Sequence, residues 1–118
     1  MRVLIARFLG TDLDVELQLA GTCEQAISLV GDQKYDAITL DLMMPGVGGL
    51  GVLAAIRGGS PNAATPVIMV SSVGDDATVQ RCLAAGANAY HIKPIRRAEL
   101  VSLVRAQLKA QSPRQSDG

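Results

Sequence analysis

The sequence predicts an α/β domain built on a doubly wound parallel sheet. Short apolar runs alternate with helical patterns along the chain, which is typical of parallel strands connected by helices. One run, residues 37–40, ends at Asp41 and is followed by a proline and several glycines. A short apolar run that ends in a carboxylate indicates a buried strand delivering an acid to the carboxyl edge of its sheet. In open α/β sheets, ligands bind at this edge.

Composition limits the class of protein. With 118 residues the chain is long enough for one domain with its own core. Lysine plus arginine and aspartate plus glutamate both number 11, and aromatic residues make up 3% of the chain, so no nucleic-acid surface is indicated. No apolar run approaches the length of a membrane span. We therefore expect a cytoplasmic domain that binds neither membrane nor nucleic acid, with Cys23 and Cys82 as free thiols.

The first third of the chain predicts two strands and a helix. Residues 3–6 are apolar, and the alternation over 14–19 is typical of an edge strand or a half-exposed strand. Thr22 and Gln25 fit a capping box, which opens a helix. The inner face of this helix carries Ala26, Ile27 and Val30, and residues 31–34 form a turn.

The remaining elements follow in alternating order. We expect a helix over 50–57 that Gly58 ends, a strand over 67–70 that leads into Ser71, and a helix that Asp75 or Asp76 caps. Gly86 closes that helix in left-handed geometry. A last strand over 89–92 ends at Lys93-Pro94, and a final helix covers about 97–109.

The glycine run after the central strand invites a second interpretation. Gly46-x-Gly48-Gly49-x-Gly51 matches the dinucleotide-binding fingerprint. In that motif the glycines begin where the strand ends, and an acid closes the next strand. Here residues 41–45 intervene and the next strand closes with Ser71. We therefore interpret these glycines as loop residues and not as a nucleotide site.

Three polar side chains are expected to meet at one edge. Asp41, Ser71 and Lys93 each stand at the carboxyl end of a predicted strand. These ends share one edge in a parallel sheet, so a carboxylate, a hydroxyl and an ammonium group converge there. Such a group of side chains suits a small anionic ligand.

With these residues identified, the chain resembles a receiver domain of a two-component response regulator. The resemblance covers about residues 14–108 and rests on three motifs in order: Asp41-x-x-Met44-Pro45, Ser71 after an apolar strand, and Gly86-Ala87-x-x-Tyr90-x-x-Lys93-Pro94. It implies a flavodoxin-like sheet of about five strands. Residues 1–110 would form the receiver-like domain and 111–118 a flexible tail or linker.

The resemblance also implies the role of each site residue. Asp41 would accept a phosphoryl group from a histidine kinase or phosphotransfer protein, while Ser71 and Lys93 would bind phosphoryl oxygens. Tyr90 would be the switch aromatic, and the peptide bond before Pro94 would be cis. Such a domain is not an enzyme, beyond self-phosphorylation and dephosphorylation of Asp41.

The chain departs from the family pattern in its acids. Receivers carry two acids just after the first strand, where this sequence has Ala6-Arg7-Phe8. The expected metal ligands are therefore only Asp41 and the backbone carbonyl of Met43, which predicts weak or absent Mg²⁺ binding. Asp12 and Asp14 lie near a turn that we place at the other end of the sheet.

The chain also lacks room for the first helix of the family. Only residues 7–13 separate the first two predicted strands, and a parallel crossover usually needs a dozen residues or more. We favour an antiparallel hairpin around Gly10-Thr11-Asp12; the alternatives are that the first strand joins a partner's sheet or is loosely attached. The missing helix would leave part of a sheet face uncovered, which predicts a homodimer.

Two functions remain open at this point. The first is a receiver domain in phosphorelay signal transduction with Asp41 as phosphoacceptor. The second is a phosphorylation-independent pseudo-receiver that acts as an interaction or dimerisation module. A receiver shortened by truncation or engineering is a third explanation for the missing helix.

Overall fold

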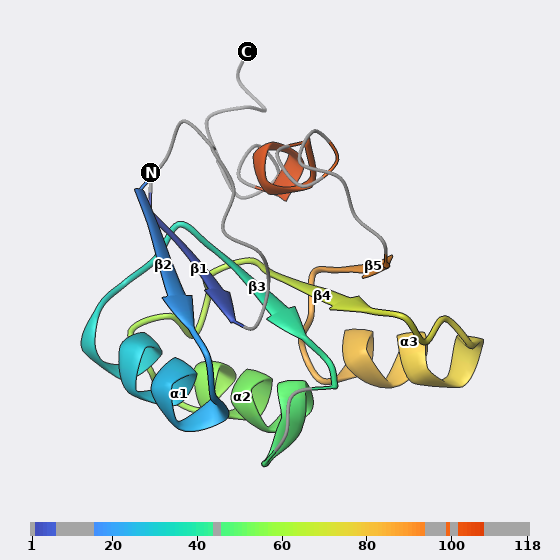
Figure 1. Ribbon diagram of the computed structural model, residues 1–118, viewed down its shortest axis with the longest axis horizontal. Coiled ribbons are helices and arrows are strands. Elements are labelled where there is room, and N and C mark those ends of the chain that lie inside the picture. Colours follow the sequence, from blue (N-terminus) through green and yellow to red (C-terminus); the bar gives the residue numbers. More distant parts are fainter. Residues whose placement is uncertain (1, 7–15, 44–45, 94–98, 100–101, 108–118) are drawn as a thin grey trace.

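The computed structural model describes residues 2–6, 16–43, 46–93, 99 and 102–107. Its centre is a five-stranded sheet in the order β2-β1-β3-β4-β5 (Figure 1). Every neighbouring pair of strands is parallel. The strands are β1 (Arg2–Ala6), β2 (Glu16–Ala20), β3 (Ala37–Asp41), β4 (Val67–Ser71) and β5 (Ala89–Ile92).

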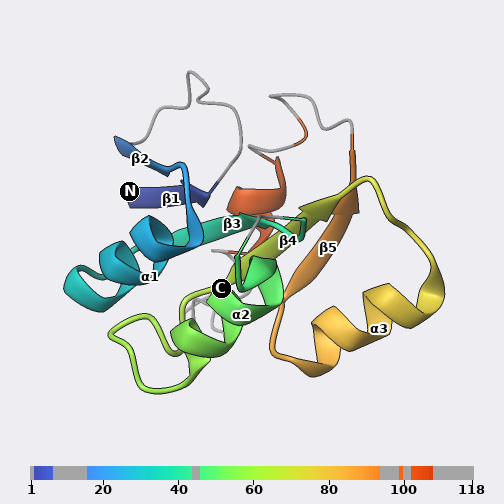
Figure 2. The same ribbon diagram turned by 60° about the horizontal axis from the view of Figure 1, so that its bottom comes forward.

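Helices cover both faces of this sheet. On one face lie α1 (Cys23–Asp32), α2 (Gly48–Arg57) and α3 (Asp76–Ala84), while residues 102–107 form a helix on the opposite face (Figures 1 and 2). This arrangement confirms the doubly wound α/β class. Within the described residues, no helix has the length and apolar character needed to cross a membrane.

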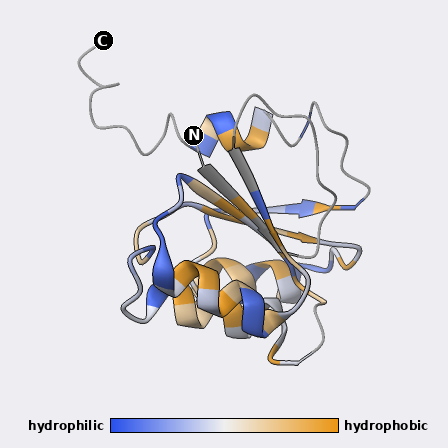
Figure 3. Cartoon of the chain, turned by 60° about the vertical axis from the view of Figure 1, so that its left-hand side comes forward, coloured by the Kyte–Doolittle hydropathy of each residue, from blue (hydrophilic) through white to orange (hydrophobic). Residues whose placement is uncertain are grey.

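The core follows from the apolar character of the two central strands. All residues of β3 and β4 are buried, as expected for parallel strands covered on both faces. Side chains alternate between faces, so Ile38, Leu40 and Met69 join the main cluster with α1 and α2. Figure 3 shows hydrophobic residues along the central strands and in the helices packed against them. On the other face, Val104 of the helix at 102–107 is buried.

The predicted helix caps are confirmed, with one difference. The Thr22 hydroxyl accepts a hydrogen bond from the Gln25 N–H at 3.1 Å, but the Gln25 side chain accepts from Gly21 and not from Thr22. Asp75 caps α3 by accepting from the Thr78 N–H at 3.1 Å. Gly86, with φ of 113°, lies after α3 in the left-handed region, as predicted. The α1 helix extends to Asp32, so the turn predicted at 31–34 begins later.

The predicted hairpin between the first two strands is wrong. β1 pairs in parallel with β2, from Arg2 opposite Glu16 to Ala6 opposite Ala20, and it also pairs with β3 in its own sheet. The physical reason is reach: residues 7–15 span up to about 30 Å when extended. Returning past a five-residue strand needs only about 13 Å. The usual minimum of about a dozen residues for a connection between parallel strands applies to connections that include a helix. The missing first helix concerns residues that lie outside the described part of the chain.

A polar network joins the elements at the amino edge of the sheet. The buried Asn62 amide donates to the carbonyls of Val30 at 2.8 Å and Gln33 at 2.7 Å. Its Oδ1 accepts from the Tyr35 N–H at 2.7 Å. The Arg57 guanidinium, at the end of α2, donates six hydrogen bonds. Two go to the Gly86 carbonyl, and the others go to Asn62, Ala63, Thr65 and Asn88.

Candidate functional site

Three strand ends meet at the carboxyl edge of the sheet. Asp41 is the last residue of β3, Ser71 is the last residue of β4, and Lys93 follows β5. Asp41 lies opposite Val70 in the register of β3 and β4. The backbone N–H of Lys93 donates to the carbonyl of Ser71 at 2.8 Å. The predicted convergence of these three residues is therefore present in the structure.

Asp41 and Lys93 form a direct ion pair. Lys93 Nζ lies 2.9 Å from Asp41 Oδ2, and the two side chains are 35% and 8% exposed respectively. The other carboxylate oxygen, Oδ1, accepts from the Met43 N–H at 3.0 Å. Each oxygen of a nearly buried carboxylate thus has a donor, and burial strengthens such charge-assisted bonds relative to a surface pair.

Ser71 and Tyr90 are connected through the backbone of Val73. The Ser71 hydroxyl is buried and accepts from the Val73 N–H at 3.1 Å. The Tyr90 hydroxyl donates to the Val73 carbonyl. The backbone of Val73 is therefore hydrogen-bonded to both the Ser71 hydroxyl and the Tyr90 hydroxyl. Val73 was not singled out by the sequence, although it lies two residues after the serine that ends β4.

The interpretation of the glycines after Asp41 as loop residues holds only for Gly46, because α2 begins at Gly48 and not at residue 50 as predicted. Gly46 and Gly48 have φ values of 90° and 78°, which favour glycine. A Cβ on Gly49 would lie 2.6 Å from the Asp41 carbonyl oxygen and 2.8 Å from Leu42 Cα. The start of α2 therefore approaches the end of β3 more closely than any side chain allows. This packing accounts for the glycine run without a nucleotide.

The described residues offer few metal ligands at this edge. No group of three or more His, Cys, Asp or Glu side chains that could hold a metal occurs in the described ranges. The Asp41 carboxylate and the Met43 carbonyl are two oxygen donors within one turn. Mg²⁺ keeps several waters and often binds through one or two carboxylates plus phosphate oxygens. These donors therefore fit a weakly held Mg²⁺.

Several predicted residues lie outside the described part of the chain. They are Arg7, Phe8, Asp12, Asp14, Met44, Pro45 and Pro94, so the cis peptide bond before Pro94 stays a prediction. Cys23 and Cys82 are both buried, and the Cys23 thiol donates to the Gly48 carbonyl at 3.8 Å. Burial raises the pKa of Cys82, which keeps this thiol protonated and unreactive at neutral pH.

The comparisons with known proteins agree with this geometry. The profile of the response regulator receiver domain matches residues 1–105. The DNA-binding response regulator MtrA of Mycolicibacterium smegmatis is 34% identical over 109 residues, which cover 92% of this chain and 45% of MtrA. The chain thus spans about half the length of this curated relative.

Two solved receiver domains have the same fold. The receiver domain of the Francisella response regulator 1452 is 26% identical with a TM-score of 0.81, and the match covers 94% of this chain and 98% of that one. The receiver domain of the sensor histidine kinase PA1611 from Pseudomonas aeruginosa PAO1 is 25% identical with a TM-score of 0.79, and the match covers 91% of this chain and 96% of that one. That structure has a magnesium ion coordinated in its active site cleft.

These similarities support phosphorelay signalling and give no support to the phosphorylation-independent alternative. They agree with the fold of the parallel sheet. The chain therefore belongs to the family of response regulator receiver domains, which are signalling modules of phosphorelays.

Proposed function

We propose that Asp41 is the phosphoacceptor of this receiver domain and takes its phosphoryl group from a phosphohistidine. The observation that carries the proposal is the 2.9 Å contact between Lys93 Nζ and Asp41 Oδ2 at the edge where Ser71 also lies. Phosphoryl transfer depends mainly on positioning and on stabilising negative charge. A carboxylate nucleophile with an ammonium group and a hydroxyl beside it meets both needs.

In the proposed reaction, a carboxylate oxygen of Asp41 attacks the phosphorus. The phosphorus–nitrogen bond of the donor histidine breaks as the phosphorus–oxygen bond of an acyl phosphate forms, and the imidazole leaves with the electron pair and takes up a proton. Negative charge moves from the carboxylate to the phosphoryl oxygens. The Lys93 ammonium group would stabilise the negative charge on the phosphoryl oxygens. The Ser71 hydroxyl, which accepts from the Val73 N–H, would donate its proton in a hydrogen bond to a phosphoryl oxygen.

The Asp41 carboxylate and the Met43 carbonyl would hold Mg²⁺ during the transfer, together with phosphoryl oxygens and water. When bound, the ion would supply positive charge that offsets the negative charge of the transferred group. With two protein oxygens, we propose that binding is weak before the phosphoryl group arrives.

The partners follow from this chemistry. We propose a histidine kinase or a phosphotransfer protein as donor, a cytoplasmic location, and no catalysis beyond self-phosphorylation and dephosphorylation of Asp41. We also propose that the chain forms a homodimer. The support is Leu19, which is 55% exposed on the edge strand β2.

Intact mass spectrometry tests the phosphoacceptor. The chain is incubated with acetyl phosphate and Mg²⁺, beside the variant Asp41→Asn. We expect the parent chain to gain one phosphoryl group and the variant to gain none. Lys93→Gln should fold but gain the group more slowly, because it removes the cation next to Asp41 Oδ2.

Two results would contradict the proposal that Asp41 is the phosphoacceptor. A folded parent chain that gains no mass would contradict the proposal and support the pseudo-receiver. A gain that persists in Asp41→Asn would place the phosphoryl group on another residue. Circular dichroism of each variant establishes that a negative result does not come from unfolding.

A further inference from the structure

The strand β2 is an open edge of the sheet. It stands last in the strand order, and no described strand pairs with its outer side. Edge strands commonly carry lysine, proline or a bulge that discourages pairing with another chain. The sequence of β2, Glu-Leu-Gln-Leu-Ala, contains neither lysine nor proline, and its five residues pair with β1 without a bulge. The outer backbone groups of β2 are therefore suited to another strand.

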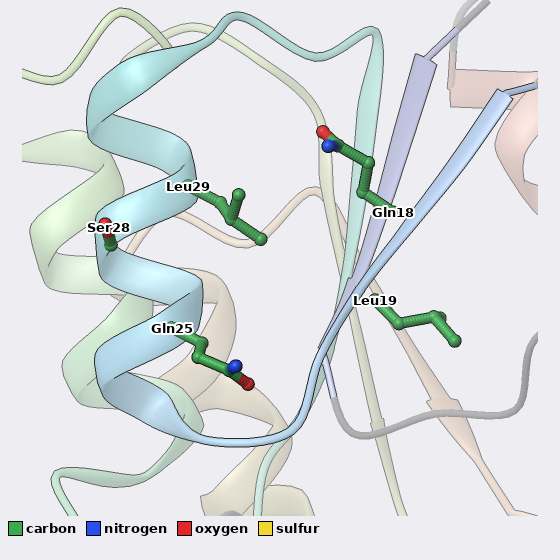
Figure 4. Close-up of a pocket in the computed structure, with 5 residues that line it drawn as sticks. All are labelled: Gln18, Leu19, Gln25, Ser28 and Leu29. Atoms are coloured by element: carbon green, nitrogen blue, oxygen red, sulfur yellow. The ribbon is translucent and has the colours of Figure 1, made fainter.

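Leu19 is an exposed apolar residue on the face of β2 turned away from α1. Leu19 is 55% exposed, and Figure 4 shows its side chain on the side of the strand opposite to Gln18 and α1. Because side chains alternate along a strand, position 17, also leucine, falls on the same face as Leu19. Positions 17 and 19 of the open edge are both leucine in the sequence and are called the apolar strip below.

The other face of β2 borders a groove. This groove lies between β2 and α1 and has a volume of about 340 Å³. It is lined by Gln18, Leu19, Gln25, Ser28 and Leu29 (Figure 4). None of these five described residues is charged, and position 16, a glutamate, falls on the same face as Gln18 because side chains alternate along a strand.

We propose that two copies of this chain pair through β2 in an antiparallel arrangement with Gln18 on the twofold axis. The sequence of the strand is complementary to itself in this register. Position 17 lies opposite position 19 of the partner subunit, so a leucine is paired with a leucine on each side of the axis. Gln18 lies opposite its own copy, and Glu16 lies opposite an alanine. The two sheets become one continuous sheet.

Charge does not oppose a second copy as the occupant. The only charged residue of β2 is Glu16. In the proposed register the two glutamates stand four residues apart, about 14 Å along the strands. That distance exceeds the Debye length of about 8 Å at physiological salt, so their repulsion is screened. This inference names the surface of the proposed homodimer and does not depend on phosphorylation of Asp41.

Sedimentation velocity over a range of chain concentrations tests the pairing. We expect the parent chain to approach twice its monomer mass of 12.3 kDa as concentration rises. Leu19→Lys should raise the dimer dissociation constant by about tenfold or more, since it replaces the apolar strip with two charges per dimer. The matched control is Leu83→Lys, because Leu83 is 39% exposed on α3, at the other side of the sheet. The control and Asp41→Asn should dimerise like the parent chain.

A cysteine at the twofold axis tests the register. Directly opposed residues of antiparallel strands fall within disulfide range, so Gln18→Cys should form a covalent dimer on mild oxidation. Leu83→Cys should not. The inference is overturned if the parent chain stays monomeric, if Leu19→Lys leaves the dimer intact, if Leu83→Lys dissociates it, or if Gln18→Cys fails to cross-link. If Leu19→Lys does not fold, the cross-linking result decides alone.

Discussion

Two buried threonines near the sheet differ in whether their hydroxyls have partners. The Thr39 hydroxyl, in β3, has no hydrogen-bond partner among the described residues. The Thr65 hydroxyl lies 3.2 Å from the Tyr35 carbonyl oxygen and 3.0 Å from Asn62 Oδ1. A buried hydroxyl without a partner costs free energy, whereas a satisfied hydroxyl contributes to the unfolding free energy. The same substitution should therefore have opposite effects at these positions.

We expect Thr39→Val to leave the free energy of unfolding unchanged or to raise it by up to about 1 kcal/mol. Thr65→Val should lower it by about 1–3 kcal/mol, because it removes a buried donor from two acceptors. Urea denaturation of both variants gives the comparison. A larger loss at Thr39 than at Thr65 would mean that Thr39 has a partner in solution.

At the scale of elements, α3 depends on its cap. The pKa of Asp75 is lowered, first by the hydrogen bond from the Thr78 side chain and then by that from the Thr78 backbone N–H. A depressed pKa means that the unfolded chain binds the proton more tightly. The contribution of the cap is therefore complete above the unfolded pKa of about 3.9 and is lost as pH falls through the lower folded value.

We expect Asp75→Ala to lower the unfolding midpoint at neutral pH. The difference from the parent chain should shrink as pH falls below about 4, because the Asp75 carboxylate of the parent chain then becomes protonated and no longer stabilises the helix start. Thermal unfolding followed by circular dichroism across this pH range measures it. Asp76→Ala is the matched control, because Asp76 is the next residue and Asp75 provides the cap. An equal, pH-independent loss in both variants would argue against the cap.

The sequence was sufficient to predict features that depend on neighbouring residues. The apolar runs predict β3 and β4, because strands buried on both faces need no alternation. Thr22 and Asp75 predict helix starts, since their side chains accept from N–H groups three residues ahead. The meeting of Asp41 and Lys93 follows once the strands are parallel.

Other features depend on residues that are distant in sequence. Nothing local marks Asn62, which bonds to Val30 across 32 residues and to Gln33 across 29. Arg57 likewise bonds to Gly86 across 29 residues. The direction of β2 relative to β1 was mispredicted because a short connection allows either a hairpin or a plain return without a helix. Local patterns do not distinguish these two paths.

At the scale of the whole molecule, the carboxyl edge of the sheet carries less negative charge than the family pattern requires. Asp41 ends β3, and its charge is paired with Lys93. Arg7 directly follows Ala6, the last residue of β1, which pairs with Leu40 just before Asp41. An arginine therefore occupies a place in the sequence where receivers have an acid. We expect an arginine at this position in the sequence to weaken the binding of a divalent cation.

We expect Mg²⁺ to stabilise the unphosphorylated chain only slightly, since a ligand present at its dissociation constant adds about 0.4 kcal/mol. Arg7→Asp should increase the rise in unfolding midpoint that MgCl₂ causes, because it replaces a repelling cation with an oxygen ligand. Arg105→Asp makes the same charge change at an exposed position of the helix at 102–107. This control should show the same rise in unfolding midpoint with MgCl₂ as the parent chain. Differential scanning calorimetry with and without MgCl₂ measures all three. If the parent chain already responds as strongly as Arg7→Asp, the cation is held without an acid after β1, and weak binding through Asp41 and Met43 is the wrong account of this edge.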